Sequence, residues 1–258
     1  MMVSNAKKNA REELRQQRAA AAARKRRNRA IGVGAIIVVV LAAIVTTVVL
    51  VATNKAAPTA AQTTGVPPHA NSDHTGIIVN PGKASASAPV VAIYLDYQCP
   101  ICHELETTYG SSFESLANSG GIQLEYHTMT FIDQNAKNDS SENAAIGAAC
   151  ADIQGVYSAY HDQVFANQPT QEGAGYSQTL LRDTIPTTIG LTGSKLAAFQ
   201  QCYDTQATKA FVDNVAAQAL ASGVTGTPTI KVNGKQLAVS QLGDPSNLQN
   251  VINTAAES

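Results

Sequence analysis

The chain has 258 residues, which is enough for one or two domains, and its net charge of −1 conceals an uneven distribution. Residues 1–29 carry ten Lys and Arg against two Glu, whereas the remainder carries eight Lys and Arg against seventeen Asp and Glu, which gives charges of +8 and −9. The sequence has no internal repeats and no second apolar run long enough to cross a bilayer, which excludes a repeat protein and a membrane protein with several spans.

The first predicted element is a transmembrane helix at 30–53, a run of twenty-four residues without a charge. Five Lys and Arg lie within 24–29, so the positive-inside rule places the N-terminus in the cytoplasm and residues 54–258 outside it. The run is longer than the core of a typical secretory signal peptide, and we expect an uncleaved anchor, with cleavage as the alternative. The basic arm 1–29 is expected to set this topology and to contact anionic lipid rather than nucleic acid.

Residues 54–75 are rich in Ala, Thr and Pro and lack an apolar period, which predicts a linker between the membrane and a folded domain. We expect the histidines of this linker, His69 and His74, to be solvated. The domain is expected to begin near Gly76 and to span residues 76–258. The four cysteines of the chain fit an oxidising compartment, where disulfides persist.

The first half of the domain predicts two strands, a helix and a third strand. Residues 76–80 favour a short strand, and the apolar run 90–95 (VVAIYL) is typical of a strand buried on both faces of a sheet. Residues 103–116 favour a helix, and alternation at 122–127 predicts the next strand. The short links imply parallel strands with a right-handed crossover. The core-facing stripe of the helix is expected to comprise Ile101, Leu105, Tyr109, Phe113 and Leu116.

A helical insertion is predicted at about 133–203, because this part of the chain is rich in alanine and is divided by Pro- and Gly-containing loops. A further helix is expected at 205–221. The helices of the insertion are expected within 141–165, 177–185 and 193–203.

The last part of the chain predicts a hairpin at 224–239, whose strands flank Asn233-Gly234, a pair that suits a type I′ turn. Asp244 and Pro245 then begin the final helix as its N-cap and first residue. The complete order of elements predicts an α/β protein with a thioredoxin fold interrupted by an all-helical domain.

The candidate chemistry centres on Cys99 and Cys102, which lie where the apolar run 90–95 gives way to the first helix. A spacing of one helical turn brings two sulfurs together, so the pair can alternate between dithiol and disulfide. The N-terminal end of a helix favours negative charge, which should lower the pKa of the leading thiol. The pattern therefore indicates a redox site.

Two other interpretations of this motif need a metal or a prosthetic group. Half of a zinc site would need two further ligands, but Cys150 and Cys202 belong to no second CxxC or CxxH pair. The sequence CPICH formally matches a c-type haem attachment motif. It follows a buried strand rather than lying in a helical cytochrome setting, and Met129 is the single methionine after residue 2. We therefore expect no metal and no organic cofactor.

The combination of Asp-x-x-Cys-Pro-x-Cys after a strand with a later Thr-Pro before another strand resembles the DsbA-like family of thiol–disulfide oxidoreductases. The resemblance covers roughly 76–258. It implies that Cys99 is the exposed nucleophile and Cys102 the buried resolving thiol. It also implies that Pro228 follows a cis peptide bond beside the active site. The residues that carry the resemblance are Asp96, Cys99, Pro100, Cys102, Thr227 and Pro228.

The residues of the substrate groove bear on the direction of electron flow. The groove is expected to include Pro100, Ile101, Thr227 and Pro228. Ile101 stands where enteric DsbA proteins carry a histidine, and Thr227 stands where they carry a valine. Both departures leave the direction of electron flow open.

Two further residues near the cysteines each have two possible roles. Asp96 either assists proton transfer to or from Cys102 or serves as a strand-end or cap residue. His103 either stabilises the Cys99 thiolate or is a solvated histidine in the first turn of the helix.

Cys150 and Cys202 both fall in or beside the helical insertion, and we expect a structural disulfide between them. DsbA relatives from actinobacteria resemble this chain in carrying such an additional pair. Two unpaired buried thiols are the alternative, which an oxidising compartment disfavours.

The resemblance, together with the anchor, implies a single-pass protein of the cell membrane whose catalytic domain is extracytoplasmic and introduces disulfides into exported proteins through Cys99 and Cys102. It implies reoxidation by a membrane partner of the DsbB or VKOR type. We expect a monomer. Two alternatives stay open: a disulfide isomerase or reductase, including one that serves cytochrome c maturation, and a non-catalytic copper- or peptide-binding module.

Overall fold

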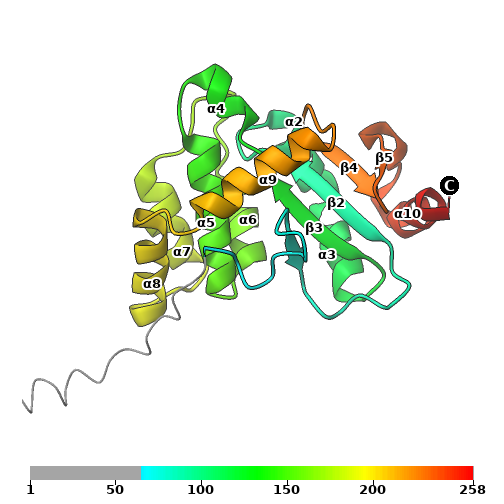
Figure 1. The fold of residues 1–258 in the computed structure, drawn as a ribbon, viewed down its shortest axis with the longest axis horizontal. Helices are drawn as coiled ribbons and strands as arrows, with labels where there is room; N and C mark the ends of the chain where they lie inside the picture. The colour runs from blue at the N-terminus through cyan, green and yellow to red at the C-terminus, as the bar shows by residue number, and fades with distance from the viewer. Residues whose placement is uncertain (1–64, 258) are drawn as a thin grey trace, which may run out of the picture. The chain divides into compact units, whose positions relative to one another are not determined.

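The computed structural model describes residues 65–257, which form a mixed β-sheet with helices on both faces and at one end (Figure 1). The strands are β1 (Ile77–Val79), β2 (Val90–Leu95), β3 (Gln123–Thr128), β4 (Thr229–Val232) and β5 (Lys235–Leu237). The α-helices are α2 (Pro100–Leu105), α3 (Ser111–Asn118), α4 (Phe131–Ala136), α5 (Ser140–Ile153), α6 (Tyr157–Ala166), α7 (Ile185–Thr188), α8 (Gly193–Asp204), α9 (Lys209–Ala221) and α10 (Leu248–Glu257). The π-helical segments are η1 (Glu106–Gly110) and η2 (Leu180–Thr184), and the 3₁₀ turns are η3 (Val239–Gln241) and η4 (Pro245–Asn247).

The strand order across the sheet is β1-β3-β2-β4-β5. The central pair, β2 and β3, is parallel, with Val91 opposite Leu124, and the crossover through α2 and α3 makes this possible. All other neighbouring pairs are antiparallel. The thioredoxin fold predicted from the order of elements is therefore confirmed.

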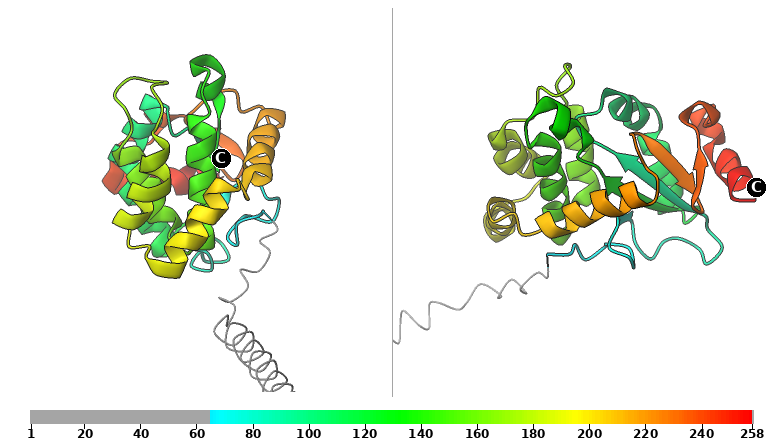
Figure 2. Two further views of the ribbon diagram at one scale, coloured as in Figure 1. Left: turned by 90° about the vertical axis from the view of Figure 1, so that its left-hand side faces the viewer. Right: turned by 45° about the horizontal axis from the view of Figure 1, so that its top comes forward.

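The sheet is covered on both faces. Helix α9 crosses one face over β3, while α3 and α10 pack on the other face (Figure 1). Helices α5, α6, α7 and α8 gather at one end of the sheet, and α10 lies at the opposite end (Figure 2). This double cover explains why β2 has no alternation of apolar and polar residues. Val91, Ile93 and Leu95 are fully buried on one face, and Tyr94 is buried on the other face in a cluster with Ala219 of α9.

The hairpin between β4 and β5 turns at Asn233 and Gly234. Their φ angles are 47° and 81°, both in the left-handed region that a type I′ turn requires. Asparagine and glycine tolerate this region better than other residues, so the turn and the pairing of Ile230 with Leu237 agree with the local sequence.

The helix expected at 103–116 is interrupted. It begins earlier, at Pro100, and changes at Glu106–Gly110 into a π-helical segment before continuing as α3. Steps of four residues drift around an α-helix by about 40° each, and a π turn absorbs this drift and keeps Leu105 and Phe113 in the core. Ile101, which was expected at the start of the core-facing stripe, is instead 58 % exposed.

The folded part also begins before Gly76. Asp152 of α5 accepts hydrogen bonds from the backbone N–H of His69 (3.0 Å) and lies 2.8 Å from its Nδ1, so His69 contacts the domain rather than solvent alone. The carbonyl oxygen of His74 accepts a bond from Asn214 in α9. The second half of the predicted linker is therefore part of the domain surface.

The arm 1–29, the predicted transmembrane helix at 30–53 and the first part of the linker lie outside the described residues. Within residues 65–257, every helix is too short or too polar to cross a bilayer.

Candidate active site

Cys99 is the N-cap of α2, directly after the loop that leaves β2. Its backbone is extended, and Pro100 follows as the first helical residue, where the missing N–H of proline sacrifices no helical bond. The backbone N–H of Cys102 donates to Cys99 Sγ at 3.4 Å. Both residues are free thiols in this structure. Cys99 therefore lies at the start of the helix, and the first helical turn places Cys102 beneath it.

The two thiols differ sharply in acidity. Hydrogen bonds, first from Cys102 and also from the Thr227 side chain and the backbone, lower the pKa of Cys99 to about 6, although burial opposes them. Burial raises the pKa of Cys102 well above its ordinary value, and the neighbouring Cys99 adds to this. Cys102 is completely buried, whereas Cys99 retains 6 % exposure. Cys99 is therefore the thiolate at neutral pH and the sulfur that a partner can reach.

A second wall of the site comes from the other half of the chain. Strand β4 runs antiparallel to β2 with Thr229 opposite Tyr94, so the residues before Thr229 lie beside those after Tyr94. This register places the Thr227 carbonyl oxygen 3.6 Å from Cys99 Sγ, as an acceptor for the thiol. The peptide bond between Thr227 and Pro228 is cis.

Two exposed residues border the cysteine pair on the helix side. Pro100 and Ile101 both face solvent next to Cys99, and Ile101 is one of the few large apolar side chains in the described part of the chain that are mostly exposed. The part of Ile101 and Pro100 in a substrate groove stays a prediction.

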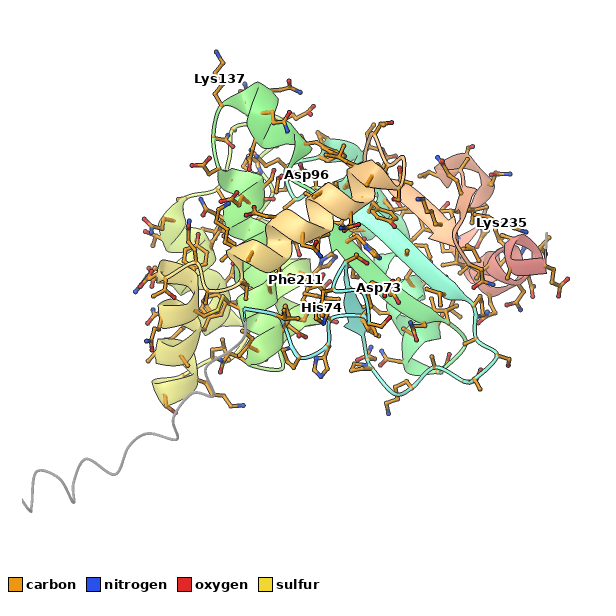
Figure 3. The ribbon with its side chains drawn as sticks, viewed as in Figure 1. Asp73, His74, Asp96, Lys137, Phe211 and Lys235 are labelled. Atoms are coloured by element: carbon orange, nitrogen blue, oxygen red, sulfur yellow. A yellow bond between two sulfur atoms is a disulfide. The ribbon has the colours of Figure 1, made fainter. Side chains whose placement is uncertain are left out.

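Asp96 lies at the end of β2, where the sheet meets α4 and α5 (Figure 3). Its carboxylate accepts bonds from Ser141 Oγ (2.6 Å) and from the backbone N–H of Gln98 (2.9 Å) and Ile132 (3.0 Å). Burial raises the pKa of Asp96 to about 6 in spite of these bonds. Among the hydrogen bonds of residues 65–257, none joins this carboxylate to a cysteine side chain, and its partners are those of a cap that ties the active-site loop to the insertion.

His103 is half-buried in the first turn after Cys102. Its Nδ1 donates to the carbonyl oxygen of Phe165 in α6 at 3.0 Å. The imidazole is therefore held against α6, and a role in stabilising the Cys99 thiolate stays a prediction.

Two residues of the insertion support the active-site loop and have no distinguishing signal in the sequence. Gln168 Nε2 donates to the carbonyl oxygens of Tyr97 (2.7 Å) and Cys99 (3.0 Å). The Tyr176 hydroxyl donates to the same Tyr97 carbonyl. Both residues lie in the irregular segment between α6 and η2, where no periodicity could have indicated their direction. The insertion thus fixes the backbone that carries the nucleophile.

A disulfide joins Cys150 of α5 to Cys202 of α8, the pair expected from the sequence. The two cysteines are 52 positions apart in the sequence, and both lie in the helical insertion. Since α5 also contributes Ser141 to Asp96, the disulfide braces the same helix that contacts the active-site loop.

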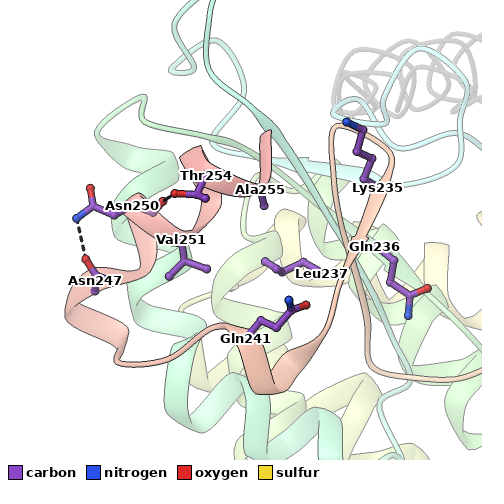
Figure 4. A pocket seen from close by; sticks show the side chains of 9 residues that line it. All are labelled: Lys235, Gln236, Leu237, Gln241, Asn247, Asn250, Val251, Thr254 and Ala255. Atoms are coloured by element: carbon purple, nitrogen blue, oxygen red, sulfur yellow. Dashed lines mark hydrogen bonds between the residues drawn. The ribbon is translucent and has the colours of Figure 1, made fainter. Parts of the chain in front are cut away.

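A pocket of about 460 Å³ lies elsewhere, between β5 and α10 (Figure 4). Leu237 and Val251 form its apolar floor, and amide side chains such as Gln241 and Asn250 surround it. It contains no cysteine, histidine or carboxylate, so the redox chemistry belongs to the cysteine pair. Within the described part of the chain, no group of three or more His, Cys, Asp or Glu residues is placed to hold a metal ion.

Comparisons with known proteins agree with this architecture. A sequence model of the family described as Thioredoxin matches residues 78–254. The structure is similar to that of MdbA, a thiol-disulfide oxidoreductase from Actinomyces oris, with a TM-score of 0.62 and 18 % identity over 74 % of this chain and 92 % of that chain. It is also similar to MdbA from Corynebacterium diphtheriae, with a TM-score of 0.57 and 16 % identity over 70 % and 90 % of the two chains.

The reduced DsbA of Mycobacterium tuberculosis is a third similar structure, with a TM-score of 0.54 and 22 % identity over 71 % of this chain and 98 % of that chain. A search of curated protein sequences finds no match. At these identities the structural likeness shows a shared fold, and the chemistry must be argued from the residues of the site.

Proposed function

The chain belongs to the thioredoxin family, and from this membership we propose that it is a protein thiol–disulfide oxidoreductase that introduces disulfides into exported proteins. The observation that carries the proposal is the unequal pair at the start of α2, in which Cys99 has a pKa of about 6 and Cys102 stays a buried, neutral thiol. A low pKa makes Cys99 a good leaving group and stabilises the reduced protein, which favours the transfer of the disulfide to a substrate.

The reaction begins with Cys99 and Cys102 joined as a disulfide. A substrate thiolate attacks Cys99 Sγ, a mixed disulfide forms, and Cys102 leaves and takes up a proton. A second substrate thiolate then attacks the substrate sulfur of the mixed disulfide and expels Cys99 as a thiolate. The substrate loses two electrons and gains a disulfide, while the protein gains the same two electrons as a dithiol.

The names given to the similar structures support this assignment. Two are MdbA proteins described as thiol-disulfide oxidoreductases, and a third is a DsbA. The exposed Ile101 beside Cys99 and the carbonyl group of Thr227 opposite it supply a place for an extended polypeptide at the reactive sulfur.

The proposal includes a location and a partner. The uncharged segment 30–53 would anchor the chain in the cell membrane with the N-terminus inside, and the domain would act as a monomer on the outer side. The disulfide between Cys150 and Cys202 suits that oxidising side. A quinone-linked membrane protein of the DsbB or VKOR type would return Cys99 and Cys102 to the disulfide.

Mixing the oxidised full chain with a synthetic peptide that holds two cysteines tests the function. We expect one peptide disulfide to form for each protein disulfide consumed. Cys99→Ser should abolish the reaction. Cys102→Ser cannot carry the protein disulfide, so it is mixed instead with the oxidised peptide; Cys99 should attack the peptide disulfide, release one peptide thiolate and accumulate a mixed disulfide that mass spectrometry places on Cys99. Peptide oxidation that persists in the Cys99→Ser variant would contradict the proposal.

A further inference from the structure

A pocket of about 280 Å³ opens beside the active-site helix, between η1, the start of α3 and the end of α6. His103 lies at its end nearest the cysteines, and three carboxylates line it: Glu106, Glu114 and Asp162. His103 is four residues after Cys99, which places this end about 6 Å along the helix from the nucleophile. The pocket is therefore close to a bound substrate but separate from the redox pair.

Two of these carboxylates have an oxygen without a partner. The Glu106 side chain is only 9 % exposed, and its Oε2 accepts a bond from the Tyr126 hydroxyl at 3.1 Å and lies 3.5 Å from His161 Nε2. Its Oε1 is buried and has no hydrogen-bond partner among the described residues, and the same is true of Glu114 Oε1. Buried carboxylate oxygens without donors are costly, so each such atom requires an explanation.

The charge of the pocket is also unbalanced. Among the described residues that line it, none is lysine or arginine, and histidine is the single basic type. Burial raises the pKa of Asp162 to about 6, opposed by His161 and reinforced by Glu114 and Glu106. These carboxylates would each gain from a donor that carries positive charge.

We propose that this acidic pocket is a specificity subsite that binds an arginine or lysine side chain of the polypeptide undergoing disulfide exchange at Cys99. A guanidinium group presents several N–H donors in a fixed plane, so one arginine can bond to more than one carboxylate oxygen of the pocket. Glu106 lies seven residues after Cys99, about 10 Å along the helix, and an extended chain advances about 3.3 Å per residue, so the basic residue lies about three positions from the reacting cysteine. The inference rests on the proposed function, because it assumes that a polypeptide docks at Cys99.

A metal ion is the other cation that carboxylates attract. The described residues hold no group of three or more His, Cys, Asp or Glu placed for one. The geometry therefore favours an organic cation that enters from outside.

The first test measures binding without redox chemistry. The full chain in detergent micelles is titrated with a fluorescent peptide in which serine replaces the reacting cysteine and arginine lies three residues away on each side. A matched peptide carries citrulline, a neutral analogue of arginine. We expect the arginine peptide to bind about tenfold more tightly than the citrulline peptide at low ionic strength. This ratio of the two dissociation constants should shrink as salt is added.

Variants that each remove one carboxylate charge then show which residues cause the preference for the arginine peptide over the citrulline peptide. Glu106→Gln and Glu114→Gln should each reduce the ratio to about threefold or less, and Glu114→Gln remains informative if the more buried Glu106 is needed for folding. Glu104→Gln is the matched control, since it removes one charge from an exposed position of α2 outside the pocket and should keep the full ratio.

A ratio near one in the unaltered protein, or a ratio that neither variant changes, would overturn the subsite. Binding of Ca²⁺ or Zn²⁺ that needs Glu106 or Glu114 and displaces the arginine peptide would overturn it as well. Failure of the proposed function is a separate result: peptides with two cysteines would then stay reduced whether they carry arginine or citrulline, while the serine peptides still decide the subsite.

Discussion

Ser141 Oγ donates a 2.6 Å hydrogen bond to Asp96 Oδ1, which connects the first turn of α5 to the end of β2. The carboxylate is fully buried, so water cannot replace this donor. Through this contact the helical insertion holds the loop that leads to Cys99.

Ser141→Ala should therefore lower the free energy of unfolding by about 1–3 kcal/mol, the usual cost of leaving a buried acceptor without its donor. Urea denaturation measures the loss. Ser115→Ala, at an exposed position of α3, is the control and should change stability by no more than about 0.5 kcal/mol. Equal stabilities of the two variants would show that Ser141 does not support Asp96.

Alkylation of the reduced protein should follow the ionisation of Cys99. Because hydrogen bonds lower the pKa of this thiol to about 6, the rate with iodoacetamide should rise with a midpoint near pH 6 and then level off. Cys102 should stay unmodified in the folded protein because it is buried. In the Cys99→Ser variant the reaction with this midpoint should disappear, and a midpoint above 8 in the unaltered protein would refute the assignment of Cys99 as the thiolate.

The same ionisation predicts how stability depends on pH. The pKa of Cys99 is lower in the folded state, from 9.0 to about 6, so its contribution to stability is complete above pH 9 and is lost as the pH falls through 6. Compared with the oxidised form, the reduced form should gain about 2 kcal/mol between pH 5.5 and 7.5. Urea unfolding of both forms at several pH values checks this, and a difference that stays constant with pH would contradict it.

Removal of the second disulfide should affect stability more than chemistry. The bond between Cys150 and Cys202 has a sequence separation of 52, and a loop of this length stabilises by about 4 kcal/mol in the chain-entropy model. The double variant Cys150→Ala and Cys202→Ala should lose most of this amount in urea denaturation. The pair Cys99→Ala and Cys102→Ala serves as control at pH 5.5, where the Cys99 thiolate contributes little, because it removes two thiols without opening this loop.

Gly147 of α5 lies directly against Tyr160 of α6. A Cβ atom at this position would overlap the Tyr160 hydroxyl, which is fixed by its 3.0 Å bond to the Leu181 carbonyl oxygen. Gly147→Ala should therefore destabilise by about 1–3 kcal/mol, although alanine is the better helix former by about 1 kcal/mol. Gly226→Ala, where a Cβ meets no atom within 4 Å, is the steric control. A higher midpoint temperature of thermal unfolding for Gly147→Ala than for the unaltered protein would contradict this packing.

The sheet and the cysteine pair could be predicted because their signals are local. An apolar β-branched run at Val90–Leu95 and the turn residues Asn233-Gly234 each specify one conformation. Likewise, the thiols of Cys99 and Cys102 share one helical turn, so their proximity follows from spacing alone.

Other parts of the site depend on contacts between distant segments. Gln168 and Tyr176 reach the active-site backbone from an irregular loop, and nothing in their neighbourhood of the sequence indicates that direction. The acidic pocket likewise forms only when Asp162 of α6 packs beside Glu106 and Glu114. The early start of the domain was missed for the same reason, because His69 finds its partner Asp152 across 83 positions of sequence.

The direction of electron flow is the central claim, and the reduction potential of the Cys99–Cys102 pair tests it most directly. Lowering the pKa of Cys99 from 9.0 to about 6 stabilises the reduced form at pH 7 by about 1.4 kcal/mol, or about 30 mV. Equilibration of the full chain with glutathione buffers should give a potential clearly less negative than the about −270 mV of thioredoxin, shifted towards the values of protein disulfide isomerase and DsbA (about −180 and −120 mV). A potential near about −270 mV, as in thioredoxin, would mark a reductant and contradict the proposed function.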